Sequence, residues 1–332
     1  MLLYVRNEVN QNEHRTPIIP QDIPILLHRG YIIYIESSQH RIYKDEEYEN
    51  KGAIITTLPW YSPEFTPAYI IGLKELRELD KLDSHRHIYF SHCHKKQKGS
   101  EIILDAFNKS NSHLYDFEHF VDGNNKRLIS FGFYAGIVGC FLGLFQYIQK
   151  IQGLPNIKNL TSWNSKEEVI GQLKKDRAFI SGARIAILGA YGNCGKGVIS
   201  ILEEQGISYD ILTKTSNSTD FINYDIFFNC ILLDMAYDKI WFSSDTVFLK
   251  HLLIVDISCD YSKPNNPIAI YNTETTWEEP VYSYNNMVDV IAINNLPSLL
   301  PKDSSDYFSN RFTGLLSMPL IPYGQPTAPW IH

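Results

Sequence analysis

The chain has 332 residues, of which 44% are hydrophobic and 20% are charged, a composition typical of globular proteins that fold in water. This length is sufficient for two domains, each with its own core. The net charge of −7, from 30 basic and 37 acidic residues, argues against electrostatic binding to nucleic acid or to an anionic membrane. The five cysteines are odd in number and lack zinc spacing, so we expect reduced thiols in the cytoplasm. No basic segment followed by an apolar one opens the sequence, and we therefore expect no signal peptide.

The N-terminal part alternates short apolar runs with helical patterns. The predicted strands are residues 2–5, 32–35, 54–57, 69–71 and 88–91. The predicted helices are residues 22–28 and 101–108. Such alternation favours a parallel sheet with helices packed on it.

Residues 131–148 form an uncharged segment of 18 residues, the lower limit for a membrane span. Its glycines at positions 132, 136, 139 and 143 are three or four residues apart, a spacing that also lets a helix pack closely against another element. Because α/β patterns flank the segment on both sides, we predict a buried helix between two domains and no membrane span.

A polar stretch, residues 156–177, leads to a second alternating series. Its predicted strands are residues 185–188, 209–212, 226–230, 252–257 and 288–293. Two such series predict an α/β protein of two Rossmann-like, doubly wound domains with an active site in the cleft between them. We place a substrate domain at residues 1–131, a dinucleotide domain at 132–302, and a C-terminal return to the first domain at 303–332.

Three glycines, Gly189, Gly192 and Gly195, follow the first strand of the second series as G-x-x-G-x-x-G. They permit a tight turn that brings backbone N–H groups and a helix N-terminus against a pyrophosphate. A second strand follows at βαβ distance, which favours dinucleotide binding over a tight turn with no ligand. The predicted cofactor-binding positions are Gly189, Tyr191, Gly192, Asn193, Cys194, Gly195, Thr213, Lys214, Thr215, Cys230 and Asp256.

Two further polar side chains, Lys74 and His92, follow neighbouring predicted strands of the first series. The intervening residues are enough for a parallel crossover, so both side chains would project from the carboxyl ends of the sheet, where open α/β sheets bind ligands. A lysine and a histidine there can divide acid and base catalysis. The alternative is a solvated pair of Lys74 with Glu75 and a histidine bonded to backbone.

Two His-x-His pairs, at positions 85 and 87 and at positions 92 and 94, together with Cys93, raise the possibility of a metal site. Residues two apart on a strand share a face, so each pair could chelate. No carboxylate or cysteine stands at a spacing that would complete a closed tetrahedral site. We therefore expect no metal.

Short motifs typical of one family run in order through nearly the whole chain. They occupy residues 6–8, 13–15, 71–75, 91–95, 114–118, 126–127, 131–136, 192–195, 225–230, 255–260, 265–268 and 296–301. Through these motifs the sequence resembles the lysine-forming saccharopine dehydrogenases, which belong to the wider alanine dehydrogenase and transhydrogenase N-terminal superfamily. The resemblance implies two Rossmann-like domains with the active site in the cleft, and reversible NAD(P)-dependent oxidation of a secondary amine, through an imine, to an amino acid and a 2-oxo acid.

The resemblance also implies roles for individual residues. Lys74 and His92 match the acid–base pair. Arg15 and Arg127 match residues that hold substrate carboxylates, a task suited to the forked guanidinium.

Other matched positions complete the implied site. Glu75 and Glu118 match acids that temper its positive charge, and Lys95 matches a further polar residue. Cys194 and Cys230 match a pair that forms a disulfide in some relatives, which leaves open whether they do so here.

The sequence departs from the family pattern at several positions. Asn10 stands where the family has lysine, and Asn294 and Asn295 replace an Asp-His pair. After the second strand of the dinucleotide domain, residues 213–215 read Thr-Lys-Thr where the family places an aspartate for the ribose. A cation and hydroxyls there accommodate a 2′-phosphate, so the sequence leans toward NADP(H).

The leading hypothesis is an oxidoreductase that makes or breaks an N-(carboxyalkyl) amino acid, with an amino acid and a 2-oxo acid as its small-molecule partners. An imine reductase acting on a different amine is the alternative among enzymes. A degenerate protein that binds nucleotide without turnover is the alternative of another class. The oligomeric state stays open.

Overall fold

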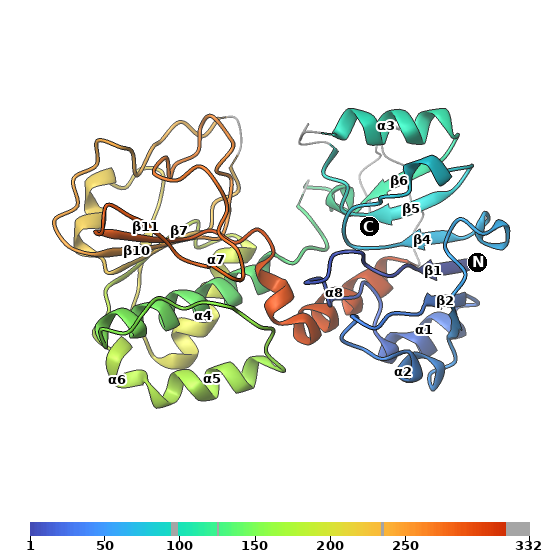
Figure 1. Ribbon diagram of the computed structural model, residues 1–332, viewed down its shortest axis with the longest axis horizontal. Helices are drawn as coiled ribbons and strands as arrows, with labels where there is room; N and C mark the ends of the chain where they lie inside the picture. The colour runs from blue at the N-terminus through green and yellow to red at the C-terminus, as the bar shows by residue number, and fades with distance from the viewer. Residues whose placement is uncertain (94–98, 125, 234–235, 317–332) are drawn as a thin grey trace. The chain divides into compact units, whose positions relative to one another are not determined.

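The computed structural model describes residues 1–93, 99–124, 126–233 and 236–316 (Figure 1). The chain divides into two compact units. Unit 1 comprises Met1–Ser130 with Pro301–His332, and unit 2 comprises Phe131–Leu300. Each unit contains its own six-stranded sheet.

The sheet of unit 1 is parallel throughout. Its strands, in spatial order, are β3 (Ile54–Thr56), β2 (Ile32–Glu36), β1 (Leu2–Val5), β4 (Tyr69–Ile71), β5 (Arg86–Tyr89) and β6 (His113–Asp116). Its helices are α1 (Ile23–His28), α2 (Asp45–Glu49), α3 (Ser100–Lys109) and α8 (Pro301–Leu315). The strand order reverses between β1 and β4, and this switch point is where open α/β sheets bind ligands.

Helix α8 comes from the far end of the sequence and packs on unit 1 through a row of hydroxyl groups. Ser305, Ser309 and Thr313 are four residues apart, so they share one face of the helix. The Ser309 hydroxyl accepts from the N–H of Ile19 at 2.9 Å and donates to Asp22 at 2.5 Å. These buried bonds fix the helix against the turn that precedes α1.

The sheet of unit 2 is parallel except for one edge strand. In spatial order its strands are β11 (Tyr282–Tyr284), β12 (Val288–Ile291), β10 (Leu252–Asp256), β9 (Ile226–Asn229), β7 (Ile185–Leu188) and β8 (Asp210–Leu212), with β11 antiparallel to β12. Its helices are α4 (Gly132–Ile151), α5 (Lys166–Lys175), α6 (Arg177–Ile180) and α7 (Asn193–Gln205). Strand β7 pairs with β8 on one side and β9 on the other, which places the switch point at the strand that leads into the glycine turn.

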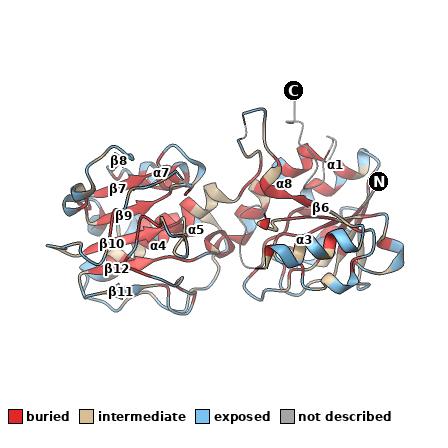
Figure 2. Ribbon diagram, turned by 90° about the horizontal axis from the view of Figure 1, so that it is seen from above, coloured by how far each residue is buried: buried red, intermediate tan, exposed pale blue. Residues whose placement is uncertain are grey.

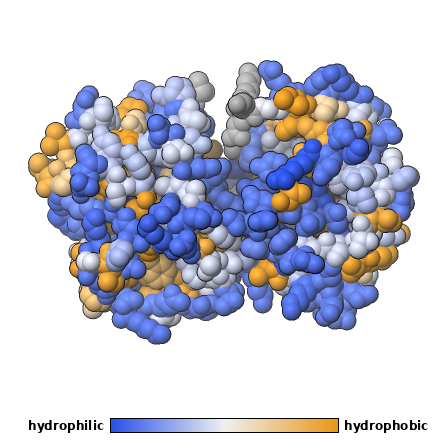
Figure 3. Space-filling model, in the orientation of Figure 1, coloured by the Kyte–Doolittle hydropathy of each residue, from blue (hydrophilic) through white to orange (hydrophobic). Residues whose placement is uncertain are grey.

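Alternate residues of the strands in unit 2 build two cores. Ile187 packs in the core that contains α4 and α7, whereas Leu188 packs with Phe221 and Phe242 on the opposite face. Figure 2 shows the inner strands β7, β9, β10 and β12 almost entirely buried, whereas the edge strands β8 and β11 are largely exposed. The surface facing the viewer in Figure 3 is mostly hydrophilic, with apolar residues in small patches.

Helix α4 is buried, as its glycine spacing predicts. Its length and composition would suit a membrane span, but 61% of its most apolar window lies inside the protein. A Cβ on Gly136 would overlap the carbonyl oxygen of Cys194, and a Cβ on Gly197 would overlap that of Phe133. The glycines thus let α4 pack directly against α7, the helix that follows the glycine turn.

The predicted fold class, two Rossmann-like α/β domains, is confirmed by the strand orders. Ten strands lie where the sequence predicts them, with ends that differ by a few residues. The sequence prediction missed β6 and β11. It also missed α5 within the polar stretch, and α8 where only a return of the chain was expected.

Candidate active site and dinucleotide site

Lys74 lies just beyond β4, at the switch point of unit 1. The two carboxylate oxygens of Glu8, which follows β1, accept from the N–H groups of Leu73 and Lys74 at 2.6 and 3.0 Å. The Arg6 guanidinium donates to the carbonyl oxygen of Lys74 and lies 3.7 Å from the Glu8 carboxylate. Two residues that follow β1 therefore fix the backbone of the loop after the neighbouring strand β4, which carries the lysine.

The side chain of Lys74 is half-buried among charged groups. Burial and the Arg15 guanidinium lower its pKa, while the carboxylates of Glu13, Glu75 and Glu8 act in the opposite direction. Arg15 donates to both oxygens of Glu13, at 2.7 and 2.6 Å. Burial alone would raise the pKa of Glu13, but this ion pair lowers it to about 2. The lysine is thereby suited to give up its proton more readily than an exposed lysine.

His92 follows β5 and faces the acid that follows β6. Its Nδ1 lies 3.1 Å from Oε2 of Glu118, and Nη1 of Arg127 lies 3.4 Å from Oε1 of the same carboxylate. The Glu118 side chain is 4% exposed, whereas those of His92 and Arg127 are about one-third exposed. One buried carboxylate thus contacts both a predicted acid–base group and a predicted substrate-binding group. Lys95 lies outside the described residues.

The segments that carry Lys74 and His92 leave the same edge of the sheet. Strands β4 and β5 are parallel neighbours, with Ile71 opposite Ile88. Beyond them, the N–H of Phe90 donates to the carbonyl oxygen of Leu73 at 3.3 Å. Both side chains therefore belong to the carboxyl ends of adjacent strands, the placement that the sequence predicts.

Of the histidines considered as metal ligands, His85 and His87 have ring centroids 6.1 Å apart, whereas His92 follows the carboxyl end of β5. His85 and His87 sit on β5 or just before it, buried against the Trp60 ring at centroid distances of 5.0 and 4.6 Å. Within the described ranges no group of three or more His, Cys, Asp or Glu side chains could hold a metal ion. His94 lies outside those ranges.

The glycine turn of unit 2 ends in a helix whose N-cap is Gly192. Gly189 has a φ of +85°, and a Cβ there would lie 2.7 Å from the backbone of Cys230. A Cβ on Gly195 would overlap the backbone of Ala190. This turn, with the N-terminus of a 13-residue helix behind it, fits a dinucleotide pyrophosphate.

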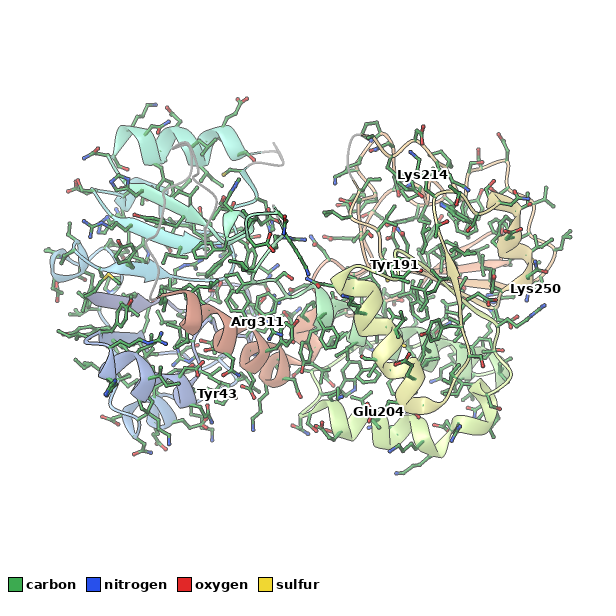
Figure 4. The ribbon with its side chains drawn as sticks, turned by 180° about the vertical axis from the view of Figure 1, so that it is seen from behind. Tyr43, Tyr191, Glu204, Lys214, Lys250 and Arg311 are labelled. Carbon is green, nitrogen blue, oxygen red and sulfur yellow. The ribbon has the colours of Figure 1, made fainter. Side chains whose placement is uncertain are left out.

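A cavity of about 330 Å³ extends from this turn to the end of β8, large enough for a small-molecule ligand. Tyr191, Thr213, Lys214 and Cys230 line it, so the structure brings together several of the predicted cofactor positions. Figure 4 shows Tyr191 and Lys214 on the same unit. Asn193 is the first residue of α7.

The loop after β8 is ordered by its own hydroxyl groups and by a lysine from farther along the chain. The N–H of Thr213 donates to the Ser216 hydroxyl at 2.9 Å, and the hydroxyls of Thr213 and Thr215 are 2.9 Å apart. The Lys239 ammonium donates to the carbonyl oxygen of Lys214 at 3.1 Å and to that of Ser216. Lys239 fixes this loop, and the sequence prediction missed it.

Lys214 itself has an acidic neighbour that the sequence prediction also missed. Its ammonium lies 2.8 Å from the carboxylate of Asp238, and both side chains are largely exposed. An exposed pair of this kind contributes little to stability and leaves the lysine able to turn toward a ligand.

Of the remaining predicted cofactor positions, Cys230 and Asp256 are buried at strand ends, and Cys194 is half-buried in the first turn of α7. Cys194 and Cys230 do not form a disulfide in the structure. Asp256, at the end of β10, accepts from the Asn229 amide at 2.9 Å and the Tyr271 hydroxyl at 2.6 Å, and burial raises its pKa. Asp256 thus joins the ends of β9 and β10.

Comparisons with known proteins identify the family and the fold of the chain. A family model described as "Alanine dehydrogenase/PNT, N-terminal domain" matches residues 4–138. A solved L-alanine dehydrogenase superposes with a TM-score of 0.71 at 14% identity, covering 95% of this chain and 89% of that one, which shows a shared fold. The saccharopine dehydrogenase (NAD(+), L-lysine-forming) of Candida glabrata is 34% identical over 99% of this chain and 94% of the relative. That of Schizosaccharomyces pombe is 35% identical over 92% of this chain and 90% of the relative. With this similarity along its whole length, the chain belongs to the family of L-lysine-forming saccharopine dehydrogenases.

Proposed function

We propose that this protein is an oxidoreductase that reversibly oxidises the secondary amine of an N-(carboxyalkyl) amino acid, using a nicotinamide cofactor. The products are an amino acid and a 2-oxo acid. One observation carries the proposal: an amine with a lowered pKa, Lys74, and an imidazole in contact with a carboxylate, His92, follow adjacent parallel strands in a member of this family.

The cofactor would be held by unit 2, with its pyrophosphate against residues 189–195 and its adenosine in the cavity that reaches β8. When bound, the nicotinamide would supply the acceptor for a hydride from the carbon next to the amine nitrogen. The substrate thereby becomes an imine, and water then adds to the imine carbon and releases the amine.

The side chains of unit 1 would move the protons of this reaction. One of Lys74 and His92 takes the proton of the substrate amine and returns it to the nitrogen when the amine is released, and the other takes a proton from the attacking water. A lysine with a lowered pKa can act as a base closer to neutral pH. The Glu118 carboxylate beside Nδ1 of His92 favours a hydrogen on that nitrogen, which makes Nε2 the basic one.

Arg127 and Arg15 would hold the substrate carboxylates. Arg127 contacts Glu118 and is about one-third exposed, so a substrate carboxylate can reach its guanidinium. Arg15 is buried with Glu13 next to Lys74 and would contribute charge as well as binding. Two such anchors suit a substrate with several carboxylates.

We further propose that the protein prefers NADP(H), although the relatives' name specifies NAD(+). The loop after β8 offers the hydroxyls of Thr213, Thr215 and Ser216 and the ammonium of Lys214 to a 2′-phosphate. Lys214→Met should lower kcat/KM for NADPH, whereas Asp238→Asn, which removes the opposing acid, should raise it. Wild-type preference for NADH by more than about tenfold, about 1.4 kcal/mol, would contradict the proposal.

A panel of amino acids crossed with 2-oxo acids, followed by the absorbance of the reduced cofactor, tests the function itself. We expect turnover with a dicarboxylic 2-oxo acid and a diamino acid. Turnover with other amines alone would favour the imine reductase. Cofactor binding with no turnover across the panel would favour a nucleotide-binding protein without catalysis.

A further inference from the structure

The carboxylate of Asp116 connects the two loops that carry His92 and Glu118. Asp116 ends β6, lies opposite Tyr89 at the end of β5, and is 1% exposed. Its Oδ2 accepts from the Ser91 hydroxyl at 2.6 Å, and its Oδ1 accepts from the N–H of Glu118 at 3.0 Å. Each oxygen therefore fixes one of the two loops.

The backbone of His92 needs such support. Its φ is +54°, in the left-handed region that residues other than glycine adopt only when surrounding contacts hold them there. The Ser91 hydroxyl that donates to Asp116 also accepts from the N–H of Cys93 at 3.3 Å. Ser91 and Cys93, on either side of His92, thus share one hydrogen-bond network with the buried Asp116 carboxylate.

The same network sets which ring nitrogen meets the acid. Glu118 Oε2 lies 3.1 Å from Nδ1 of His92, and the turn that presents Glu118 begins at the Asp116 cap. A carboxylate at Nδ1 keeps the hydrogen on that nitrogen and leaves Nε2 as the basic one. If either loop shifted, this contact and the tautomer it favours would be lost.

We propose that Asp116, through Ser91 and the backbone of Glu118, is a positioning residue that holds His92 in its left-handed conformation with Nδ1 against the Glu118 carboxylate. Asp116 touches neither the substrate nor the reacting atoms in this account. The inference rests on the proposed function, in which His92 transfers a proton.

Two substitutions test the network from its two ends. Asp116→Asn keeps the size of the side chain but replaces one of its two acceptor oxygens by an NH₂ group, which cannot accept a hydrogen bond. Ser91→Ala removes the link on the side of His92 and spares the cap of Glu118. We expect each to lower kcat about tenfold or more and to leave the Kd for the reduced cofactor unchanged.

Ser91→Thr restores a hydroxyl and should recover most of the lost kcat. Ser112→Ala is the matched control, because the Ser112 hydroxyl accepts from the N–H of His85 at 3.1 Å at the opposite, amino end of the strands. It should leave kcat and the pH profile unchanged. Near-normal kcat in both Asp116→Asn and Ser91→Ala, with the ring signals of His92 unchanged, would overturn the proposal.

The tautomer of His92 gives a readout that does not depend on turnover. In ¹⁵N-labelled protein, the ring signals of His92, assigned by their loss in His92→Gln, should be those of the Nδ1–H form. Asp116→Asn should shift them toward the other tautomer. Unchanged ring signals in Asp116→Asn would overturn the positioning role even if His92→Gln abolishes turnover. A tautomer shift with full turnover in both variants would leave the positioning role standing and contradict the proposed function.

Discussion

Nη2 of Arg15 lies 2.6 Å from Oε2 of Glu13, and both side chains are buried beside Lys74. Arg127 has a similar relationship with Glu118 at 3.4 Å. Each arginine proposed to bind a substrate carboxylate therefore contacts an acid of the protein. A guanidinium carries five N–H donors, so one protein carboxylate does not use its full capacity.

Replacing either arginine by lysine keeps the charge and removes the fork, so we expect KM for the dicarboxylic partner to rise in both variants. Arg15→Lys should also lower the free energy of unfolding by about 1–3 kcal/mol, because its paired bonds to Glu13 are buried. Arg127→Lys should leave stability unchanged, since that pair is partly exposed. Steady-state kinetics and urea denaturation measure the two effects. Normal KM in both variants would show that the arginines are structural.

The pH dependence of kcat/KM should report the charges around Lys74. The Glu75 carboxylate acts to raise the pKa of Lys74, and the Arg15 guanidinium acts to lower it. Glu75→Gln should therefore move the limb assigned to Lys74 to lower pH, and Arg15→Met should move it to higher pH. Glu78→Gln, a nearby acid on the same loop, is the control and should leave the limb in place. Shifts in the reverse directions would remove Lys74 as the titrating group.

Much of the fold follows from patterns that a single sequence displays. The glycine turn at residues 189–195 and ten of the twelve strands come from apolar runs and from the restricted geometry of tight turns. Strand β6 begins with His113 after a polar turn and is only four residues long, so it lacks a clear apolar run. Strand β11 is a short edge strand with little burial, and its pairing with β12 depends on tertiary context.

The strand ends that carry the candidate site residues are predictable from sequence, but the contacts of these residues are less so. Lys74 and His92 could be found because each follows an apolar strand. The contacts of Asp116 with Ser91 and of Lys239 with the loop after β8 join residues more than 20 positions apart. Such pairs depend on strand order and register, which periodicity does not determine.

His87 provides a test of the core of unit 1. It is 1% exposed, and neither of its ring nitrogens has a hydrogen-bond partner among the described residues. Burial and the nearby Arg6 charge lower its pKa well below the usual value, so the ring is neutral in the folded protein. The unfolded chain binds a proton there near pH 6.5, so stability should fall as the pH drops below that value, by up to about 1.4 kcal/mol per pH unit.

His87→Phe should remove this component of the pH dependence while filling a similar volume. Urea denaturation at pH 7, 6 and 5 gives the slope for each protein. An unchanged slope in His87→Phe would mean that other groups govern acid stability.

We propose that Lys74 and His92 share proton transfer and that unit 2 holds the cofactor. Steady-state kcat of Lys74→Met and His92→Gln, measured beside the Kd of the reduced cofactor by fluorescence titration, tests this proposal most directly. We predict that kcat falls by about 10²–10⁴-fold in each variant while the Kd stays within about twofold of wild type. Near-normal kcat in both variants would contradict the account.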